Sequence, residues 1–446
     1  MGSTVFDSGL FRDMFGTPAM RAVFDDRATV ARYVEVEIAL ARAESRAGVI
    51  PAEAGEAIAA AAGAITLDFE RLKRETEIVG YPILPVVAQM SKLCGEAGRY
   101  VHWGATTQDI MDTAVVLQVR AALDLVADDL DATRRALAAL ARKHRDTPMA
   151  GRTHLQQALP VTFGYKAAIW LAALDRHAER LAQLRPRVLV VQFAGAAGTL
   201  ASIGAKGLDA QRELAAELGL GVPASTWHVA RDGLAEVVNA LALLAGSLGK
   251  IAFDVMMMMA TEFGEAFEPF VHGRGASSTM PQKRNPISSE LILAASKIAR
   301  QQAGLMLDSL VTDFERATGP WHVEWAAIPE AFLATASALH QAKFMLGGLI
   351  VDAARMRRNL DITSGLIVAE AVMMGLAPFI GRQPAHDLVY DSCRLAAERG
   401  GTLLDALLES AEIAKHLDRD ALARLCDPAN YLGLAPVMVD RVLGDR

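Results

Sequence analysis

The segment Gly273–Pro286, GRGASSTMPQKRNP, places two adjacent serines, a lysine and an asparagine in one short stretch. Gly273 and Gly275 permit positive φ angles, so the chain around them has a freedom that other residues lack. Asn285 followed by Pro286 has the pattern of a helix N-cap and first helical residue. The sequence therefore predicts a mobile loop that ends at a fixed helix start.

The same loop carries groups suited to removing a proton next to a carboxylate. That step forms a dianionic intermediate, which needs a cation and hydrogen-bond donors near its oxygens, and Lys283 and Asn285 can supply them. A serine can act as the base where a lysine, backbone N–H groups or a helix dipole stabilise its alkoxide. The alternative interpretation is a surface loop with a solvated Lys-Arg pair. The density of reactive groups favours the catalytic interpretation.

Residues 277–286, SSTMPQKRNP, resemble the signature of the aspartase/fumarase superfamily, whose members are β-elimination lyases and close relatives. The resemblance implies that Ser277 is the catalytic base. It also implies that Lys283 takes part in catalysis, while Ser278 and Asn285 bind substrate.

Residues 102–113, HWGATTQDIMDT, are typical of a turn that enters a helix. Thr106 and Asp109 have the spacing of a capping box, so the free N–H groups of the helix start would face an anion. A helix cap of this kind is commonplace when it stands alone. Within the superfamily, the segment corresponds to one that binds a substrate carboxylate through Thr106 and Thr107.

Residues 151–160, GRTHLQQALP, resemble the middle motif of the same superfamily. The resemblance implies that Thr153 and Gln156 hold the substrate and that His154 protonates or orients the leaving group. Histidine suits this task because it titrates near neutral pH. The resemblance also pairs His154 with Glu290, on the helix that follows the serine loop.

The whole chain most resembles the 3-carboxy-cis,cis-muconate cycloisomerase-like branch, with further similarity in residues 314–325 and 431–433. Bacterial cycloisomerases of this branch generally carry tryptophan at the position of His154, whereas fumarate-releasing lyases carry histidine. Adenylosuccinate lyases place a histidine ahead of the first carboxylate-binding segment, and residues 1–101 contain none. We therefore expect a lyase that splits a substituted succinate, and we favour an N-substituted aspartate that yields fumarate and an amine.

Two other functions remain open at this stage. One is cycloisomerisation of 3-carboxy-cis,cis-muconate, which uses related groups without expelling an amine. The other is a catalytically inert structural oligomer, as lens crystallins related to the superfamily are. Ser277, His154, Lys283 and Asn285 together favour an enzyme over the inert oligomer. No motif identifies the leaving group or the residues that set specificity.

The composition is that of a soluble enzyme: 446 residues, 52% hydrophobic and 22% charged, with a net charge of −7. Its basic residues are scattered and give no nucleic-acid footprint. The family resemblance implies a small anionic di- or tricarboxylate as partner. The apolar segment 241–260 is interrupted by Lys250 and Asp254, and no signal-peptide pattern is present. These features predict no membrane span and a cytoplasmic location.

The sequence predicts no metal and no organic cofactor. The first prediction rests on cysteine and histidine spacing, and the second on the lack of a dinucleotide-binding motif. The three cysteines are far apart, which fits reduced thiols rather than disulfides or a zinc site. Cysteines and histidines show no close ligand spacing, and no dinucleotide-binding motif is linked to a strand.

Helical periodicity dominates the chain and predicts a nearly all-α fold. Long helices are expected near residues 109–145, 157–190, 230–266, 287–310 and 327–355, and these can form an antiparallel bundle. Three domains are expected: an N-terminal helical domain (1–105), a central long-helix bundle (106–355) and a small C-terminal helical domain (356–446). The methionine run at 256–259 is expected in the core or a subunit interface. The family resemblance further implies a homotetramer with composite active sites.

Overall fold

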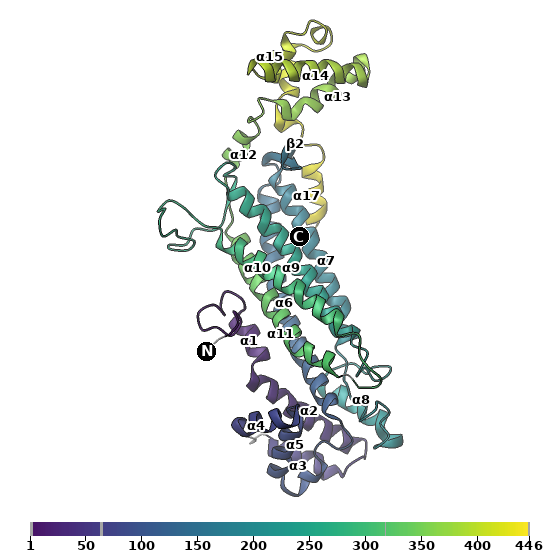
Figure 1. Ribbon diagram of the computed structural model, residues 1–446. Helices are drawn as coiled ribbons and strands as arrows, with labels where there is room; N and C mark the ends of the chain where they lie inside the picture. The colour runs from purple at the N-terminus through teal and green to yellow at the C-terminus, as the bar shows by residue number, and fades with distance from the viewer. Residues whose placement is uncertain (1–2, 63–65, 317, 445–446) are drawn as a thin grey trace. The chain divides into compact units, whose positions relative to one another are not determined.

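The computed structural model describes residues 3–62, 66–316 and 318–444 (Figure 1). The chain divides into two compact units, each made of segments that are separate in the sequence. The first unit comprises the described residues of Met1–Leu130, His177–Gly249 and Leu291–His340, and the second those of Asp131–Arg176, Lys250–Glu290 and Gln341–Arg446. The unit boundaries fall inside long helices, so they do not test the predicted three-domain division.

Long helices dominate the fold, as the apolar periodicity predicts. They are α6 (Thr107–Lys143), α7 (Phe163–Val188), α9 (Asp232–Met259), α10 (Ile287–Asp308) and α11 (Gly319–Gly347). Within the first unit, His177 Nε2 on α7 lies 2.8 Å from the Ser247 hydroxyl on α9. Gln302 on α10 donates to Glu330 on α11 at 2.6 Å. These contacts place the helices side by side in a bundle.

The first unit also contains the short N-terminal helices. They are α1 (Pro18–Phe24), α2 (Asp26–Arg46), α3 (Ala52–Ala62), α4 (Phe69–Val79), α5 (Ile83–Leu93) and, later in the chain, α8 (Gly207–Leu218), with 3₁₀ turns at Gly95–Tyr100 and Gly204–Lys206. Their apolar side chains form one core that includes Leu40, Ile58, Met90 and Leu214. Burial of this shared core therefore holds α8 to helices that precede it by more than a hundred residues.

The second unit contains the strands and the C-terminal helices. They are β1 (Pro148–Thr153), β2 (Gln156–Thr162), β3 (Ala266–Phe267), β4 (Ile350–Val351), α12 (Ala353–Asn359), α13 (Ala369–Ile380), α14 (Arg382–Arg399), α15 (Leu403–Leu408), α16 (Arg419–Leu425) and α17 (Ala435–Leu443), with 3₁₀ turns at Leu366–Val368, Ile413–Lys415 and Pro428–Asn430. The strands form two separate antiparallel pairs, β1 with β2 and β3 with β4.

The β1–β2 hairpin corrects one helix predicted from the sequence. The sequence predicts a helix from residue 157, but residues 156–162 form β2 and α7 begins at Phe163. Pro160 lacks the N–H that a helix interior requires, and the β-branched Val161 and Thr162 favour a strand. The helix expected over 230–266 likewise ends early, at Met259.

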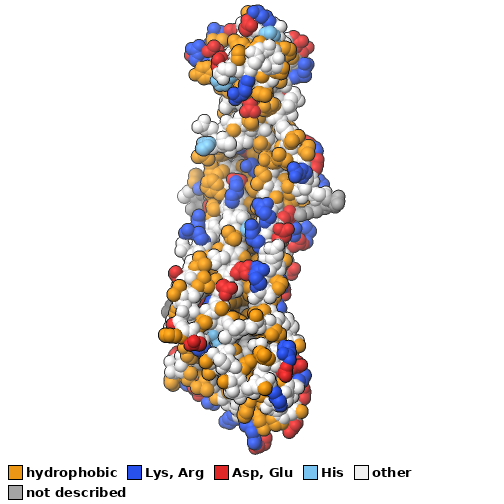
Figure 2. All heavy atoms as spheres, turned by 90° about the vertical axis from the view of Figure 1, so that its right-hand side faces the viewer, with side chains coloured by type: hydrophobic (Ala, Val, Ile, Leu, Met, Phe, Trp, Pro, Cys, Tyr) orange, Lys and Arg blue, Asp and Glu red, His pale blue; other side chains and the backbone are white. Residues whose placement is uncertain are grey.

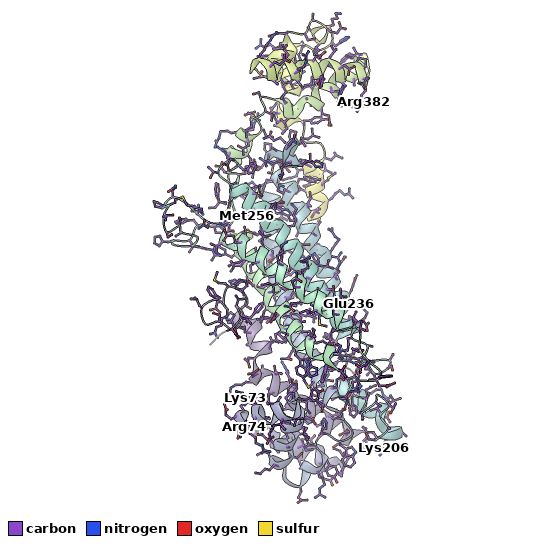
Figure 3. All side chains as sticks on the ribbon, viewed as in Figure 1. Lys73, Arg74, Lys206, Glu236, Met256 and Arg382 are labelled. Atoms are coloured by element: carbon purple, nitrogen blue, oxygen red, sulfur yellow. The ribbon has the colours of Figure 1, made fainter. Side chains whose placement is uncertain are left out.

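Helix α9 combines high apolarity with partial exposure. Its length and composition would allow it to cross a membrane, but half of its most apolar window is buried within the chain, as in the core helix of a soluble protein. Met258 is buried, whereas Met256 is half-exposed near the C-terminal end of the helix (Figure 3). Met258 alone among the four methionines therefore lies in the core, and the absence of a membrane span stays a prediction.

The surface carries both signs of charge. On the face drawn in Figure 2, basic and acidic side chains are interspersed with apolar ones. Many of the charges are paired, such as Arg46 with Glu213 at 2.6 Å and Arg145 with Asp440 at 2.7 Å. This intermixing agrees with the scattered basic residues of the sequence.

Two buried carboxylates lie on helix α2. Glu37 Oε1 is 2.6 Å from His102 Nδ1, and both carboxylate oxygens of Glu44 are buried without a hydrogen-bond partner among the described residues. Burial raises the pKa of Glu44 to about 9, and the charge of Glu37 adds to this effect. Glu44 is therefore protonated near neutral pH.

A buried ion-pair network joins α6, the start of α9 and α11. Arg231, 1% exposed, donates to both carboxylate oxygens of Asp112, at 2.8 and 2.9 Å, and to both of Glu324, at 2.9 and 2.6 Å. The Trp321 indole N–H donates to Asp112 at 3.2 Å. Burial raises the pKa of Glu324, although Arg231 opposes this shift. One guanidinium thus serves two carboxylates.

Replacing the central arginine tests the energetic weight of this network. Arg231→Met would leave Asp112 and Glu324 buried without their cation, so we expect the free energy of unfolding to fall by about 3–5 kcal/mol. The matched control is Arg187→Met, which removes a surface arginine paired with Glu236 and should change stability far less. Glu236 is labelled in Figure 3. Urea unfolding followed by circular dichroism measures both; equal effects would contradict the assigned role of the network.

Candidate active site

The predicted carboxylate-binding turn is built around Asp109, which is buried at the N-terminus of α6. One of its carboxylate oxygens accepts the backbone N–H groups of Thr106 and Gly195, both at 2.9 Å. The other accepts the Ala194 N–H at 3.1 Å and lies 2.7 Å from His228 Nε2. Four hydrogen bonds thus fix this carboxylate, and with it the backbone of the turn.

The capping box predicted from Thr106 and Asp109 is half formed. Asp109 accepts the Thr106 N–H, but the Thr106 hydroxyl faces Arg316, whose Nη1 lies 2.5 Å away. Arg316 Nε also donates to Gln108 at 3.1 Å. A guanidinium beside the free N–H groups of a helix start is well suited to bind a carboxylate. Sequence reasoning missed Arg316, because no local pattern links it to a turn 210 residues earlier.

The serine loop, residues 270–286, extends away from α10 in Figure 1 and is closed at its neck by backbone pairing. Asn285 N–H donates to Gly275 O at 2.9 Å, and Ala276 pairs with Arg284 in an antiparallel bridge. Gly275 has a φ of 70°, and a Cβ at this position would lie 2.5 Å from Asn285 O. Both the positive φ and the close approach therefore require glycine there.

A buried carboxylate caps the helix that follows the loop. The sequence predicts Asn285 as the N-cap, but α10 begins at Ile287. Its early N–H groups, those of Ser288 and Ser289, donate to the Glu268 carboxylate at 3.0 and 2.8 Å. The predicted position of the helix start is nearly right, whereas the capping group comes from 20 residues earlier in the chain.

Two arginines hold the base of the serine loop. Arg274 donates to the Ser288 hydroxyl and to Gln341 Oε1, both at 2.7 Å, and its guanidinium lies 4.6 Å from the centre of the Phe344 ring. Arg284 donates to the backbone carbonyl of Glu268 at 3.0 Å. These contacts fix the loop where it joins the helices of its own unit.

The predicted base lies in the outer part of the loop. The Ser277 hydroxyl oxygen accepts the backbone N–H groups of Met280 at 3.1 Å and Thr279 at 3.4 Å. Such donors are what a serine alkoxide needs. Ser278 and Lys283 are exposed on the same loop, and in the described part of the chain the Lys283 ammonium makes no ion pair. A free cation thus lies on the loop that carries Ser277.

His154 occupies an uncommon backbone position at the tip of the β1–β2 hairpin. His154 and Leu155 have φ angles of 51° and 64°, in the left-handed region that two-residue hairpin turns usually fill with glycine or asparagine. Thr153 and Gln156 face each other as the last strand pair before the tip. All four side chains are exposed. No hydrogen bond among the described residues joins His154 to Glu290, which is also exposed, so this pairing stays a prediction.

An ion pair supports the hairpin from below. Arg152 on β1 donates to both oxygens of buried Glu265, at 2.9 and 2.6 Å. Asn359 donates to the same carboxylate at 2.8 Å, and the Arg152 guanidinium lies 4.7 Å from the centre of the Phe263 ring. The strained tip is therefore carried on a rigid base.

The structure sorts the predicted site residues into two groups. The first unit holds Thr106 and Thr107, together with Arg316. The second unit holds Thr153, His154 and Gln156 on the hairpin, Ser277, Ser278, Lys283 and Asn285 on the serine loop, and Glu290 on α10. That the two groups meet in one active site is a prediction of the family resemblance.

A pair of glycine variants tests whether the loop neck positions the reactive groups. Gly275→Ala introduces backbone strain and a collision with Asn285, so we expect turnover to fall at least about tenfold, equivalent to about 1.4 kcal/mol. Gly273→Ala is the matched control, since its φ is 78° but a Cβ there meets no atom within 4 Å. A smaller loss in Gly273→Ala, at unchanged global stability, is the expected result of steady-state kinetics. Equal losses of turnover in the two variants would show that the positive φ, and not the collision with Asn285, causes the loss.

Comparison with known proteins gives full-length matches. A family model described as Lyase matches residues 14–300, and one described as Adenylosuccinate lyase C-terminus matches residues 365–442. The 3-carboxy-cis,cis-muconate cycloisomerase of Pseudomonas aeruginosa is 48% identical over 98% of this chain and 96% of its own length. The N-acetyl-S-(2-succino)cysteine lyase of Dickeya dadantii is 41% identical over 99% of this chain and 98% of its own. The crystal structure of fumarate lyase from Mesorhizobium sp. BNC1 shares 58% identity and a TM-score of 0.93, covering 97% of this chain and 99% of that one.

Proposed function

Since this chain belongs to the lyase family of the aspartase/fumarase superfamily, we propose that it catalyses β-elimination from a substituted succinate, with loss of the substituent from one carbon and of a proton from the adjacent carbon, and releases fumarate. The observation that carries the proposal is the setting of Ser277, whose hydroxyl oxygen already accepts two backbone N–H groups on a loop with an unpaired lysine. This is the arrangement that proton removal next to a carboxylate needs.

The first half of the reaction would be formation of a carbanion. One substrate carboxylate binds at the start of α6, against Thr106, Thr107 and the Arg316 guanidinium. The Ser277 alkoxide then takes the Cβ proton. Lys283 supplies the positive charge that stabilises the aci-carboxylate form of the intermediate, and the barrier falls because this charge is already in place.

The second half would be loss of the leaving group. Thr153 and Gln156 hold the substrate beside the hairpin tip, and Asn285 donates to its oxygens. His154, oriented by Glu290, gives a proton to the departing atom as its bond to carbon breaks. The electron pair left on carbon forms the double bond of fumarate, so atoms and charge balance without an added oxidant or reductant.

We further propose that the site is completed by neighbouring copies of the chain in a homotetramer. The support is that the two groups of site residues belong to different units, and that the hairpin tip is exposed, with Leu155 83% accessible. An exposed leucine in a strained turn gains stabilisation when a partner surface covers it.

The leaving group we favour is an amine, so the substrate would be an N-substituted aspartate. His154 is the supporting residue, because an amine leaves readily only when protonated. The Dickeya dadantii relative is named for a lyase reaction on a succinylated cysteine, which makes a thiol the next leaving group to test. The Pseudomonas aeruginosa relative supports a second function, cycloisomerisation of 3-carboxy-cis,cis-muconate.

A substrate panel separates these functions. Purified protein is offered N-substituted aspartates, adenylosuccinate, argininosuccinate, N-acetyl-S-(2-succino)cysteine and 3-carboxy-cis,cis-muconate, and products are followed by ultraviolet absorbance and mass spectrometry. We expect fumarate from an N-substituted aspartate. Lactone formation from carboxymuconate with no fumarate from any succinate would establish the cycloisomerase instead, and no turnover of the panel would favour the inert oligomer.

The assignment of the base is tested on the best substrate of that panel. Ser277→Ala removes the proposed base, so we expect kcat to fall by about 10²–10⁴-fold. Thr279→Val is the matched control, because it removes a hydroxyl two residues away whose loss leaves the backbone donor to Ser277 in place. Turnover of Ser277→Ala at the original rate would show that another group removes the proton.

A further inference from the structure

A cavity of about 330 Å³ lies beside the buried ion-pair network of the first unit. Asp112 and Glu324 line it, and Asp26 adds a third, more exposed carboxylate. Thr106, Thr107 and Arg316 do not contribute to its wall. The cavity therefore has no part in the reaction steps proposed above.

The charge of the cavity wall is one-sided. The described residues that line it include three carboxylates and no lysine, arginine or histidine. Arg231 lies behind the wall with its donors directed at Asp112, Glu324 and the Trp227 carbonyl. Asp112 and Glu324 share the single charge of Arg231, and Asp26 adds a further carboxylate to the wall, so a cation in the cavity would be favoured electrostatically.

Aromatic side chains supply the rest of the recognition surface. Trp321 and Trp325 both line the cavity, with ring centres 5.3 Å apart and planes at 79°. Tyr33 also lines it, and its hydroxyl makes no hydrogen bond to another described residue. Indole rings attract cations through their negative faces, most strongly where water is excluded. A cation with apolar substituents would satisfy both the rings and the carboxylates.

We propose that this cavity binds a small organic cation of the alkylammonium class. Its volume lies near the lower end of the range for small-molecule sites, about 300–1,000 Å³, which suits a small organic ligand. The rings contact the alkyl groups, while Asp112, Glu324 and Asp26 provide the opposite charge. The site is independent of the proposed lyase reaction, whose substrate is an anion.

The primary test compares choline chloride with its neutral carbon isostere, 3,3-dimethylbutan-1-ol, on the full-length protein. Binding is measured by isothermal titration calorimetry and by quenching of tryptophan fluorescence, at an ionic strength held constant with sodium chloride. We expect saturable choline binding at least about tenfold tighter than binding of the isostere. Equal binding of the two, or binding of neither, would overturn the proposal.

Two variants locate the bound cation. Trp325→Leu removes one ring and should weaken choline binding about tenfold while changing the affinity for the isostere much less. Asp26→Asn changes only an exposed carboxylate and should weaken choline binding about threefold, with native circular dichroism as the check on folding. Glu53→Gln, an exposed acidic residue on α3 outside the cavity wall, is the matched control and should leave binding unchanged. Unchanged choline affinity in both Trp325→Leu and Asp26→Asn would place the cation elsewhere and refute the assignment.

Discussion

The carboxylate of Asp109 is the constraint on which the first group of site residues depends. It brings together three segments that are distant in the sequence: the start of α6, the loop containing Ala194 and Gly195, and the loop containing His228. Without it, several backbone N–H groups would be buried without an acceptor, at a cost of about 1–3 kcal/mol each. The network reaches further, because Gln108 donates to the His228 carbonyl and accepts from Arg316. The turn that would receive a substrate carboxylate is thus set by one buried acid.

The second group of site residues lies on two elements that are anchored at one end and exposed at the other. The serine loop and the hairpin each have a rigid base, made by Glu268 for the loop and by Glu265 for the hairpin, and each presents an exposed outer end. A buried carboxylate bonded to N–H groups or to a guanidinium is well satisfied, so both bases resist movement. The outer ends carry Ser277 and His154, where a substrate or a neighbouring chain has access. In each element, a rigid base and an accessible outer end thus lie within a short stretch of chain.

The parts of the fold that could be predicted from the sequence are those with a local cause. Apolar periodicity predicts a helix at 109–145, and α6 spans 107–143 in the structure. It predicts another at 287–310, and α10 spans 287–308. The serine loop carries its own signature, and the roles that this signature implies for its residues stay predictions. The hairpin has no comparable signal, because its short strands sit between two long helical patterns and Pro160 is the one residue of β2 that a helix interior excludes.

The contacts that could not be predicted are those with long-range causes. Arg316 reaches Thr106, and Glu268 caps α10, through placements that only the folded chain creates. A single arginine or glutamate in a sequence does not reveal its partner. The cavity beside Arg231 has the same origin, since its wall combines residues from α2, α6 and α11.

The buried carboxyl of Glu44 on helix α2 makes part of the protein's stability depend on the pH of the solution. The carboxyl of Glu44 has an ordinary pKa of 4.5 in the unfolded chain and a pKa of about 9 in the folded one. Between these values the unfolded chain carries the charge and the folded chain does not, so each folding event at Glu44 takes up a proton from the medium. The contribution of this residue to stability is complete in mild acid and declines as the pH rises toward 9. Between pH 4.5 and 9, each rise in pH therefore lowers the contribution of Glu44 to stability, through a side chain that water does not reach.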